Sequence, residues 1–188
     1  MSMYPFFRVL SLFIAFLLFP STVLSTEISG PTVITEDENI LVSTGLSYLG
    51  KLESTIETGI EKKIVFTMEL FRVWDLWPDE FVISKKIKRT IRYDNLRGLY
   101  FVTSRDGDSL IQKKFNDFHT MKAWAFKIEE IHIANMRELE PGNYYVKVLV
   151  ESKSKKLPAV IGILMLFVPE VEMVMTKESK PFNVEGIK

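Results

Sequence analysis

Apolar and polar residues alternate through most of the chain, and a period of two is typical of β-strands with one buried face. The longest alternating runs span residues 64–71 and 81–93, and the segment 72–80 between them predicts a hairpin loop. Asp106 and Gly107 predict a tight turn between two further strands. From residue 39 on, the pattern predicts about seven to eight strands, at residues 40–43, 64–71, 81–93, 99–103, 109–114, 130–134, 144–150 and 171–175.

Apolar residues recur at spacings of three and four in two places, which is the pattern of an amphipathic helix. One helix is predicted at residues 48–58, and the second follows an N-cap at Asn116. Because short turns between strands favour antiparallel pairing, we expect a single β-rich α+β domain. It would be a curved antiparallel sheet or an open sandwich with two amphipathic helices. The apolar face of the second helix comprises Phe118, Met121, Trp124, Ala125 and Ile128.

The first 25 residues predict a secretory signal peptide. They combine a short basic start, an apolar stretch at residues 9–19 and small residues that suit cleavage near Ser25. An uncleaved N-terminal membrane anchor is the alternative. It is less favoured because Pro20 interrupts a run shorter than the roughly 20 residues that a spanning helix needs. We therefore expect an exported protein, periplasmic or secreted after cleavage.

The rest of the chain divides into three segments. Residues 26–38 are polar and turn-rich, with one short edge strand at 32–35. Residues 39–177 form the predicted β-rich domain, and residues 178–188 form a loose C-terminal tail. A continuous apolar run at residues 160–167 is too short to cross a bilayer as a helix, so it is predicted to be a buried segment.

The composition excludes several classes of protein. With 188 residues, of which 47% are apolar, the chain is too hydrophobic for a disordered protein. The 24 basic and 24 acidic residues balance, whereas a nucleic-acid binder needs a basic excess. The chain has no cysteine, which excludes disulfides, thiolate nucleophiles and iron–sulfur clusters.

Several short motifs punctuate these elements. They are Glu-Thr-Gly-Ile at 57–60, Trp-Asp-Leu-Trp at 74–77, Ile-Arg-Tyr-Asp at 91–94, Leu-Arg-Gly-Leu-Tyr at 96–100, Leu-Glu-Pro-Gly-Asn-Tyr-Tyr-Val at 139–146 and Lys-Leu-Pro at 156–158. In this order the chain resembles the bacterial family called domain of unknown function 4390 (DUF4390), over about residues 39–177. The resemblance implies an exported protein of a family without an established activity.

No arrangement of residues predicts catalysis or a cofactor. His119 and His132 stand thirteen residues apart without a metal-binding spacing, so we expect no metal site. No nucleophile elbow or Walker loop is present. The acidic residues around Gly107 predict a turn rather than a calcium loop. We therefore expect that the protein is not an enzyme.

Two groups of residues are candidates for an interaction surface. Lys86, Lys88 and Arg92 share one face of a predicted strand, which is either an ordinary solvated face or a docking surface for an acidic partner or anionic lipid headgroups. Trp74 and Trp77 lie in the predicted hairpin loop. They either fold back onto the core, the simpler expectation, or project as a hydrophobic anchor.

These observations favour a non-catalytic protein-interaction module of the cell envelope, with an envelope protein as its partner. The alternative is a carrier or sensor of a small apolar ligand or lipid, with residues 160–167 in the wall of its site. We expect no nucleic-acid partner. Contact with the membrane is expected only through the signal segment or at the surface.

Overall fold

The computed structural model describes residues 26–47, 50–154 and 170–185. The predicted signal peptide and the apolar run at residues 160–167 lie outside the described residues. Within the described part the chain is rich in strands, has few helices and pairs its strands antiparallel throughout, as the sequence pattern predicts.

The described part contains ten strands, where the pattern predicted seven or eight. The helices are α2 (Gly50–Glu57) and α3 (Phe118–Ala125), and η1 (Met136–Glu138) is a single turn of 3-10 helix. The strands are β1 (Glu27–Glu36), β2 (Asn39–Ser47), β3 (Lys62–Arg72), β4 (Glu80–Asp94), β5 (Leu99–Asp106), β6 (Ser109–Phe115), β7 (Lys127–Asn135), β8 (Gly142–Ser154), β9 (Glu170–Glu178) and β10 (Phe182–Val184).

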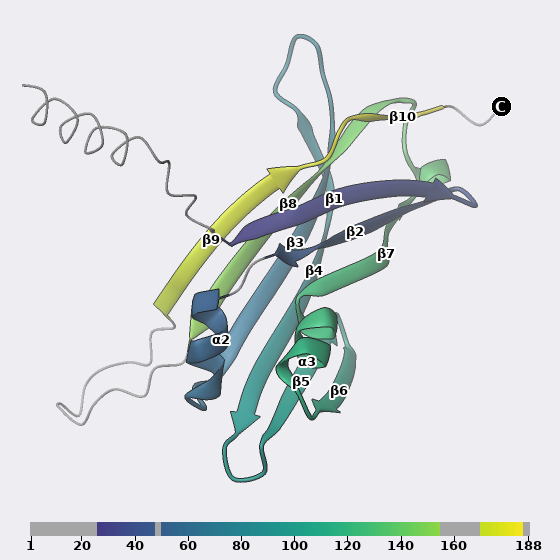
Figure 1. Cartoon of the computed structure of the whole chain (residues 1–188). Helices are drawn as coiled ribbons and strands as arrows, with labels where there is room; N and C mark the ends of the chain where they lie inside the picture. Colours follow the sequence, from purple (N-terminus) through teal and green to yellow (C-terminus); the bar gives the residue numbers. More distant parts are fainter. Residues whose placement is uncertain (1–25, 48–49, 155–169, 186–188) are drawn as a thin grey trace, which may run out of the picture.

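The strands form two sheets. The large sheet has the order β10-β8-β3-β4-β5-β6, with β9 paired to β8 as a seventh strand, and the small sheet has the order β1-β2-β7. Figure 1 shows the small sheet lying across one face of the large sheet, with α2 and α3 near the opposite end of the long strands from the β3–β4 hairpin. We call the large-sheet face that carries the core its inner face.

One edge strand was predicted too short and another was missed. The polar segment at residues 26–38 contains β1, a strand of ten residues rather than the four predicted at 32–35. β1 is the edge of the small sheet and buries only Ile28 and Pro31, so the alternation that reveals a strand is missing. The predicted loose tail contains β10, in which only Val184 is buried.

The second helix is shorter than predicted. Asp117, not Asn116, caps its N-terminus, and its carboxylate accepts a hydrogen bond from the Thr120 backbone N–H at 2.8 Å. The helix ends at Ala125. Ile128 was predicted on the helix face but belongs to β7, where pairing with β2 buries it.

β3 lies at the centre of the core. It pairs along its length with β4 on one side and β8 on the other. Every second side chain from Ile64 to Leu70 is fully buried on the inner face. Removing this apolar area from water stabilises the fold. The small sheet contributes Ile28, Ile40, Val42, Leu46, Ile128 and Ile133 to the same core.

The β3–β4 hairpin overhangs this core. β4 is fifteen residues long, but its regular burial begins only at Ile87. Phe81 and Ile83, nearer the hairpin loop, are 53% and 41% exposed. Figure 1 shows the hairpin projecting past the small sheet. Ile83 lies opposite Leu70 on the inner face, whereas the β-bulge between Leu70 and Phe71 pairs Phe81 with Phe71 on the outer face.

Two cations are buried among the described residues, Lys62 at the start of β3 and Arg89 of β4, and no sequence signal indicated either of them. Arg89 of β4 is only 8% exposed, and its guanidinium carbon lies 3.9 Å from the centre of the Trp124 ring. Within the described part of the chain its Nε and Nη1 have no hydrogen-bond partner. Burial lowers the pKa of Arg89 to about 10. The cation–π contact partly offsets the cost of burying the charge.

The position of β3 predicts a large effect of truncation at its centre. Phe66→Ala removes a fully buried ring between two strands, so we expect it to lower the free energy of unfolding by about 3–5 kcal/mol in urea denaturation. Leu96→Ala is the control, because Leu96 is 99% exposed. We expect a change within about 0.5 kcal/mol there, and equal losses in the two variants would contradict the assignment of the core.

Candidate functional site

The hairpin loop between β3 and β4 carries a cluster of exposed apolar side chains. Leu76 is 91% exposed, Trp77 75% and Trp74 42%, and the exposed ring of Phe81 follows at the start of β4. We call these four residues the aromatic tip. The expectation that Trp74 and Trp77 fold back onto the core is therefore wrong, because both are exposed, Trp77 more than Trp74.

Polar contacts fix the conformation of the loop. The Trp74 backbone N–H donates to the Asp79 carboxylate at 3.3 Å, and its indole N–H donates to the Glu80 carboxylate at 3.2 Å. The guanidinium of Arg72 lies 4.3 Å from the centre of the Trp74 ring, within cation–π range. Trp74 is thus a support of the tip, whereas Leu76 and Trp77 are its free surface.

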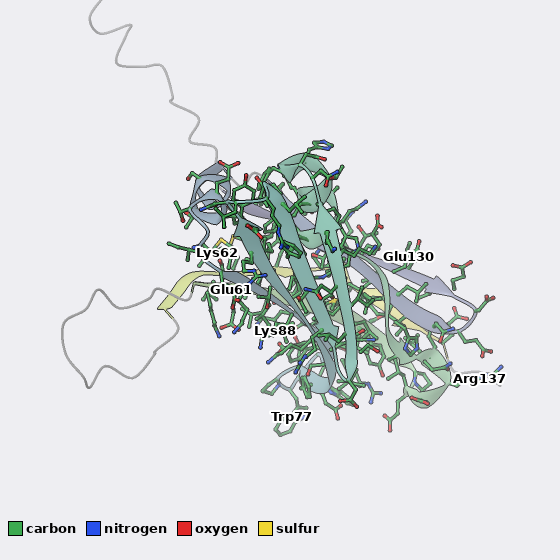
Figure 2. The ribbon with its side chains drawn as sticks, turned by 90° about the horizontal axis from the view of Figure 1, so that it is seen from below. Glu61, Lys62, Trp77, Lys88, Glu130 and Arg137 are labelled. Carbon is green, nitrogen blue, oxygen red and sulfur yellow. The ribbon has the colours of Figure 1, made fainter. Side chains whose placement is uncertain are left out.

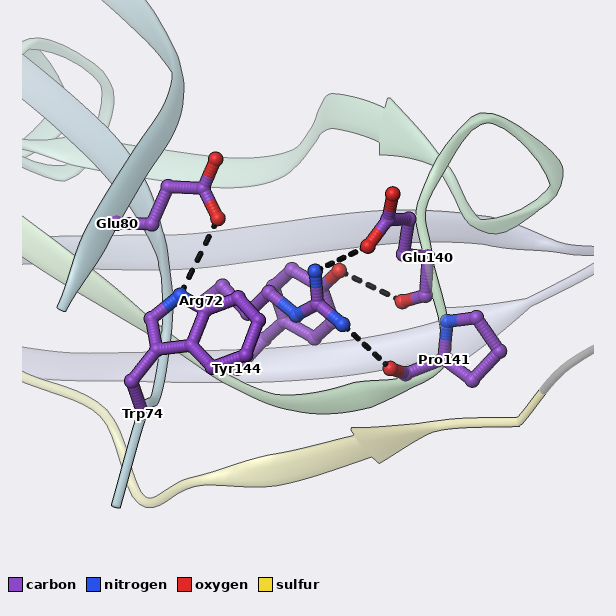
Figure 3. A network of polar contacts seen from close by, with 6 residues as sticks. All are labelled: Arg72, Trp74, Glu80, Glu140, Pro141 and Tyr144. Atoms are coloured by element: carbon purple, nitrogen blue, oxygen red, sulfur yellow. Dashed lines mark hydrogen bonds and ion pairs between the residues drawn. The ribbon is translucent and has the colours of Figure 1, made fainter. Parts of the chain in front are cut away.

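Arg72 connects the hairpin to the turn before β8. Figure 3 shows its guanidinium reaching the Glu140 carboxylate, with which it forms an ion pair, and the Pro141 carbonyl, to which it donates at 3.0 Å. The hydrogen bond with Glu140 raises the pKa of Arg72. At Gly142 a Cβ would lie 3.2 Å from Arg72 Nε, so the glycine leaves room for this side chain.

Two tyrosines of β8 complete the support. Tyr144 is buried, and its hydroxyl donates to the Glu140 carbonyl at 2.7 Å. The Tyr145 ring stacks on Phe71 at 5.4 Å between centroids, and its hydroxyl donates to the Asp79 carboxylate at 3.1 Å. These contacts tie the loop to a strand about 65 residues away in sequence, so the tip is presented on a preorganised base.

A cleft of about 430 Å³ opens at the base of the hairpin. Trp74, Phe81 and Tyr144 give it aromatic walls, and three carboxylates face a single guanidinium in its lining. Arg72 is paired with one of these carboxylates, which leaves the cleft acidic. An apolar group that carries a positive charge has the complementary chemistry. The charged lining residues are Arg72, Glu80, Glu138 and Glu140.

The predicted basic strand face lies on the outer face of the large sheet. Lys86, Lys88 and Arg92 of β4 alternate with buried residues and point away from the core, as predicted. Lys86 and Arg92 are exposed, whereas Lys88 is half-buried. Arg92 lies over the Phe101 ring at 5.5 Å. The three cations are therefore spread along one strand and do not converge.

A model of a known family matches residues 24–179, and this family is the domain of unknown function DUF4390. The chain belongs to the DUF4390 family. The match extends from just before β1 to the residue after β9. No curated protein and no solved structure matches the chain significantly.

The histidines of this DUF4390 domain are exposed on separate elements, His119 on α3 and His132 on β7. Within the residues that the structure describes, no three metal-ligating side chains of the usual types gather as a metal site. The Asp106–Asp108 segment forms the β5–β6 turn, with Gly107 at a φ of 55°. None of the described helices is long and apolar enough to cross a membrane.

The hydrogen bond between Tyr145 and Asp79 predicts that the Tyr145 hydroxyl ionises at an unusually high pH. Burial, together with the Asp79 carboxylate, raises the pKa of Tyr145 to about 12, whereas an unfolded tyrosine ionises near pH 10. The neutral hydroxyl therefore stabilises the fold below about pH 10, and this contribution is lost as the pH rises through about 12. In a pH titration followed by phenolate absorbance, we expect a step at high pH. The step should be smaller in Tyr145→Phe and should move to lower pH in Asp79→Asn. An unchanged step at high pH in Tyr145→Phe would refute the contact.

Proposed function

We propose that this DUF4390 domain is a non-catalytic interaction module of the cell envelope and that it binds a partner protein through the aromatic tip. The observation that carries the proposal is the exposure of Leu76 and Trp77 on a hairpin whose base is held by specific contacts. Single exposed apolar residues are ordinary on protein surfaces, but a cluster of this kind is not. Tryptophan is among the residues that most often dominate binding energy.

The cleft beside the tip indicates the chemistry of the partner. Its aromatic walls and its uncompensated carboxylates, Glu80 and Glu138, suit an apolar segment that carries a lysine or arginine. Glu80 already accepts the indole N–H of Trp74, so a cation bound there would also contact the base of the tip. Because the first 25 residues predict export, we place the partner in the cell envelope.

Nothing in the described part of the chain favours a carrier of apolar ligands over this proposal. Besides the cleft at the hairpin, a second cleft of about 420 Å³ lies between α3 and the small sheet. Lys122, Lys127 and Glu129 line it. Sites for apolar ligands have few polar groups, whereas at least three charged side chains line each cleft.

Site-specific photocrosslinking in the native envelope tests the proposed docking. A photoreactive phenylalanine analogue at position 77 is expected to capture a defined partner, because Trp77 is the most exposed aromatic residue of the tip. The matched control carries the analogue at position 96, which is even more exposed but lies at the β4–β5 turn. Adducts of the same pattern from both positions, or none from position 77, would remove the proposal.

The partner captured in this way allows a quantitative test. Trp77→Ala is expected to weaken its binding by about 30-fold or more, the loss typical of a hot-spot residue. Leu96→Ala should bind as tightly as the unaltered protein. Equal affinity of the Trp77→Ala variant would show that the tip is near the partner without binding it.

A further inference from the structure

A second site lies on the outer face of the large sheet. A pocket of about 230 Å³ opens over β3, β4 and β5, and Figure 2 labels Glu61 and Lys88 among its residues. Glu80, at the hairpin end of β4, is eight residues from Lys88, or roughly 25 Å along an extended strand. The pocket is therefore separate from the aromatic tip. Its polar lining comprises Lys63, Lys88, Arg105, Thr90, Thr103 and Glu61.

Strand register places these side chains together. Lys88 of β4 lies directly opposite Arg105 of β5, and Thr90 lies between Lys63 and Thr103 on its two neighbours. Directly opposed residues of an antiparallel pair have Cβ atoms about 5 Å apart. Three cations and two hydroxyls thus converge from three paired strands, so little ordering is needed to bind a ligand.

These cations have no ion-pair partner in the described part of the chain. Among the residues that the structure describes, no carboxylate forms an ion pair with Lys63, Lys88 or Arg105. Like charges directly opposite each other destabilise a sheet. The charge of Lys63, followed by burial and by Arg105, lowers the pKa of Lys88, which is the electrostatic sign of this repulsion.

We propose that the pocket binds a phosphate monoester or inorganic phosphate. Three cations and the single carboxylate of Glu61 give the lining a net charge of two positive units. A phosphate monoester carries about −1.5 to −2 charges at pH 7 and offers three acceptor oxygens, and inorganic phosphate has a similar charge. The two threonine hydroxyls can donate to these oxygens beside the charged groups. A diester, with one negative charge, matches the lining less well.

Only one of the three cations on the predicted basic strand face lines the pocket. Lys88 belongs to the pocket together with Lys63 and Arg105, which the pattern along β4 alone could not reveal. Lys86 lies two residues away on the same face but does not line the pocket. It is therefore a matched control that carries the same charge on the same strand.

Calorimetric titration of the full chain with inorganic phosphate is the test. We expect saturable binding, and Lys88→Gln should weaken it at least about tenfold through loss of a charged donor. Lys86→Gln should bind as the unaltered protein does. Because Lys88→Gln relieves repulsion, its midpoint in urea should not fall, so lost binding cannot be attributed to unfolding.

Vesicles distinguish the two sources of such a phosphate. Sedimentation with vesicles of phosphatidic acid, a lipid monoester, but not with those of phosphatidylglycerol, a diester, would support the proposal and identify a lipid source. Binding of inorganic phosphate without vesicle binding would support a soluble ligand. Equal losses in Lys86→Gln and Lys88→Gln would show a diffuse charge effect and overturn the pocket, as would the absence of both kinds of binding.

Discussion

The difference in length between the two sheets is the constraint on which the rest of the structure depends. β4 has fifteen residues, whereas the strands of the small sheet that cross it have nine or ten. Apolar side chains of the inner face are buried where the sheets overlap, as at Ile87 and Ile91, and exposed where β4 extends beyond the overlap, as at Ile83. Exposed apolar area is costly at about 25 cal/mol per Å². Contacts from Arg72 and Tyr145 hold the overhanging hairpin in one conformation despite that cost.

The sequence revealed the strands that bury one complete face. β3 and the second half of β4 alternate cleanly because each second residue enters the core. β1 and β10 were missed or shortened because edge strands bury too few residues to alternate. The apolar alternation of residues 81–83 was misleading in another way, since a β-bulge interrupts the register there and both Phe81 and Ile83 are exposed. Periodicity therefore predicts strands and their faces, but not which part of a strand another sheet covers.

The candidate sites depend on contacts that no local pattern contains. Arg72 meets Glu140 across 68 positions, and Lys63, Lys88 and Arg105 converge only after three strands adopt their register. Arg89 was invisible for the same reason, because its ring partner Trp124 lies on α3. The balanced charge of the whole chain conceals an acidic cleft at the hairpin base and a basic pocket on the outer face. The Trp-Asp-Leu-Trp motif made Trp77 a candidate for an interaction surface. Its exposure follows from the projection of the β3–β4 hairpin beyond the small sheet.

Quenching of tryptophan fluorescence by acrylamide, a neutral quencher, tests the overhang most directly. Trp77 lies outside the core, whereas the ring of Trp124 on α3 is in contact with the cations of Arg89 and Lys113. The native protein should therefore show one readily quenched component, and Trp77→Phe should remove most of it. A native protein whose three tryptophans are all protected, or a Trp77→Phe variant that is quenched as before, would contradict the account.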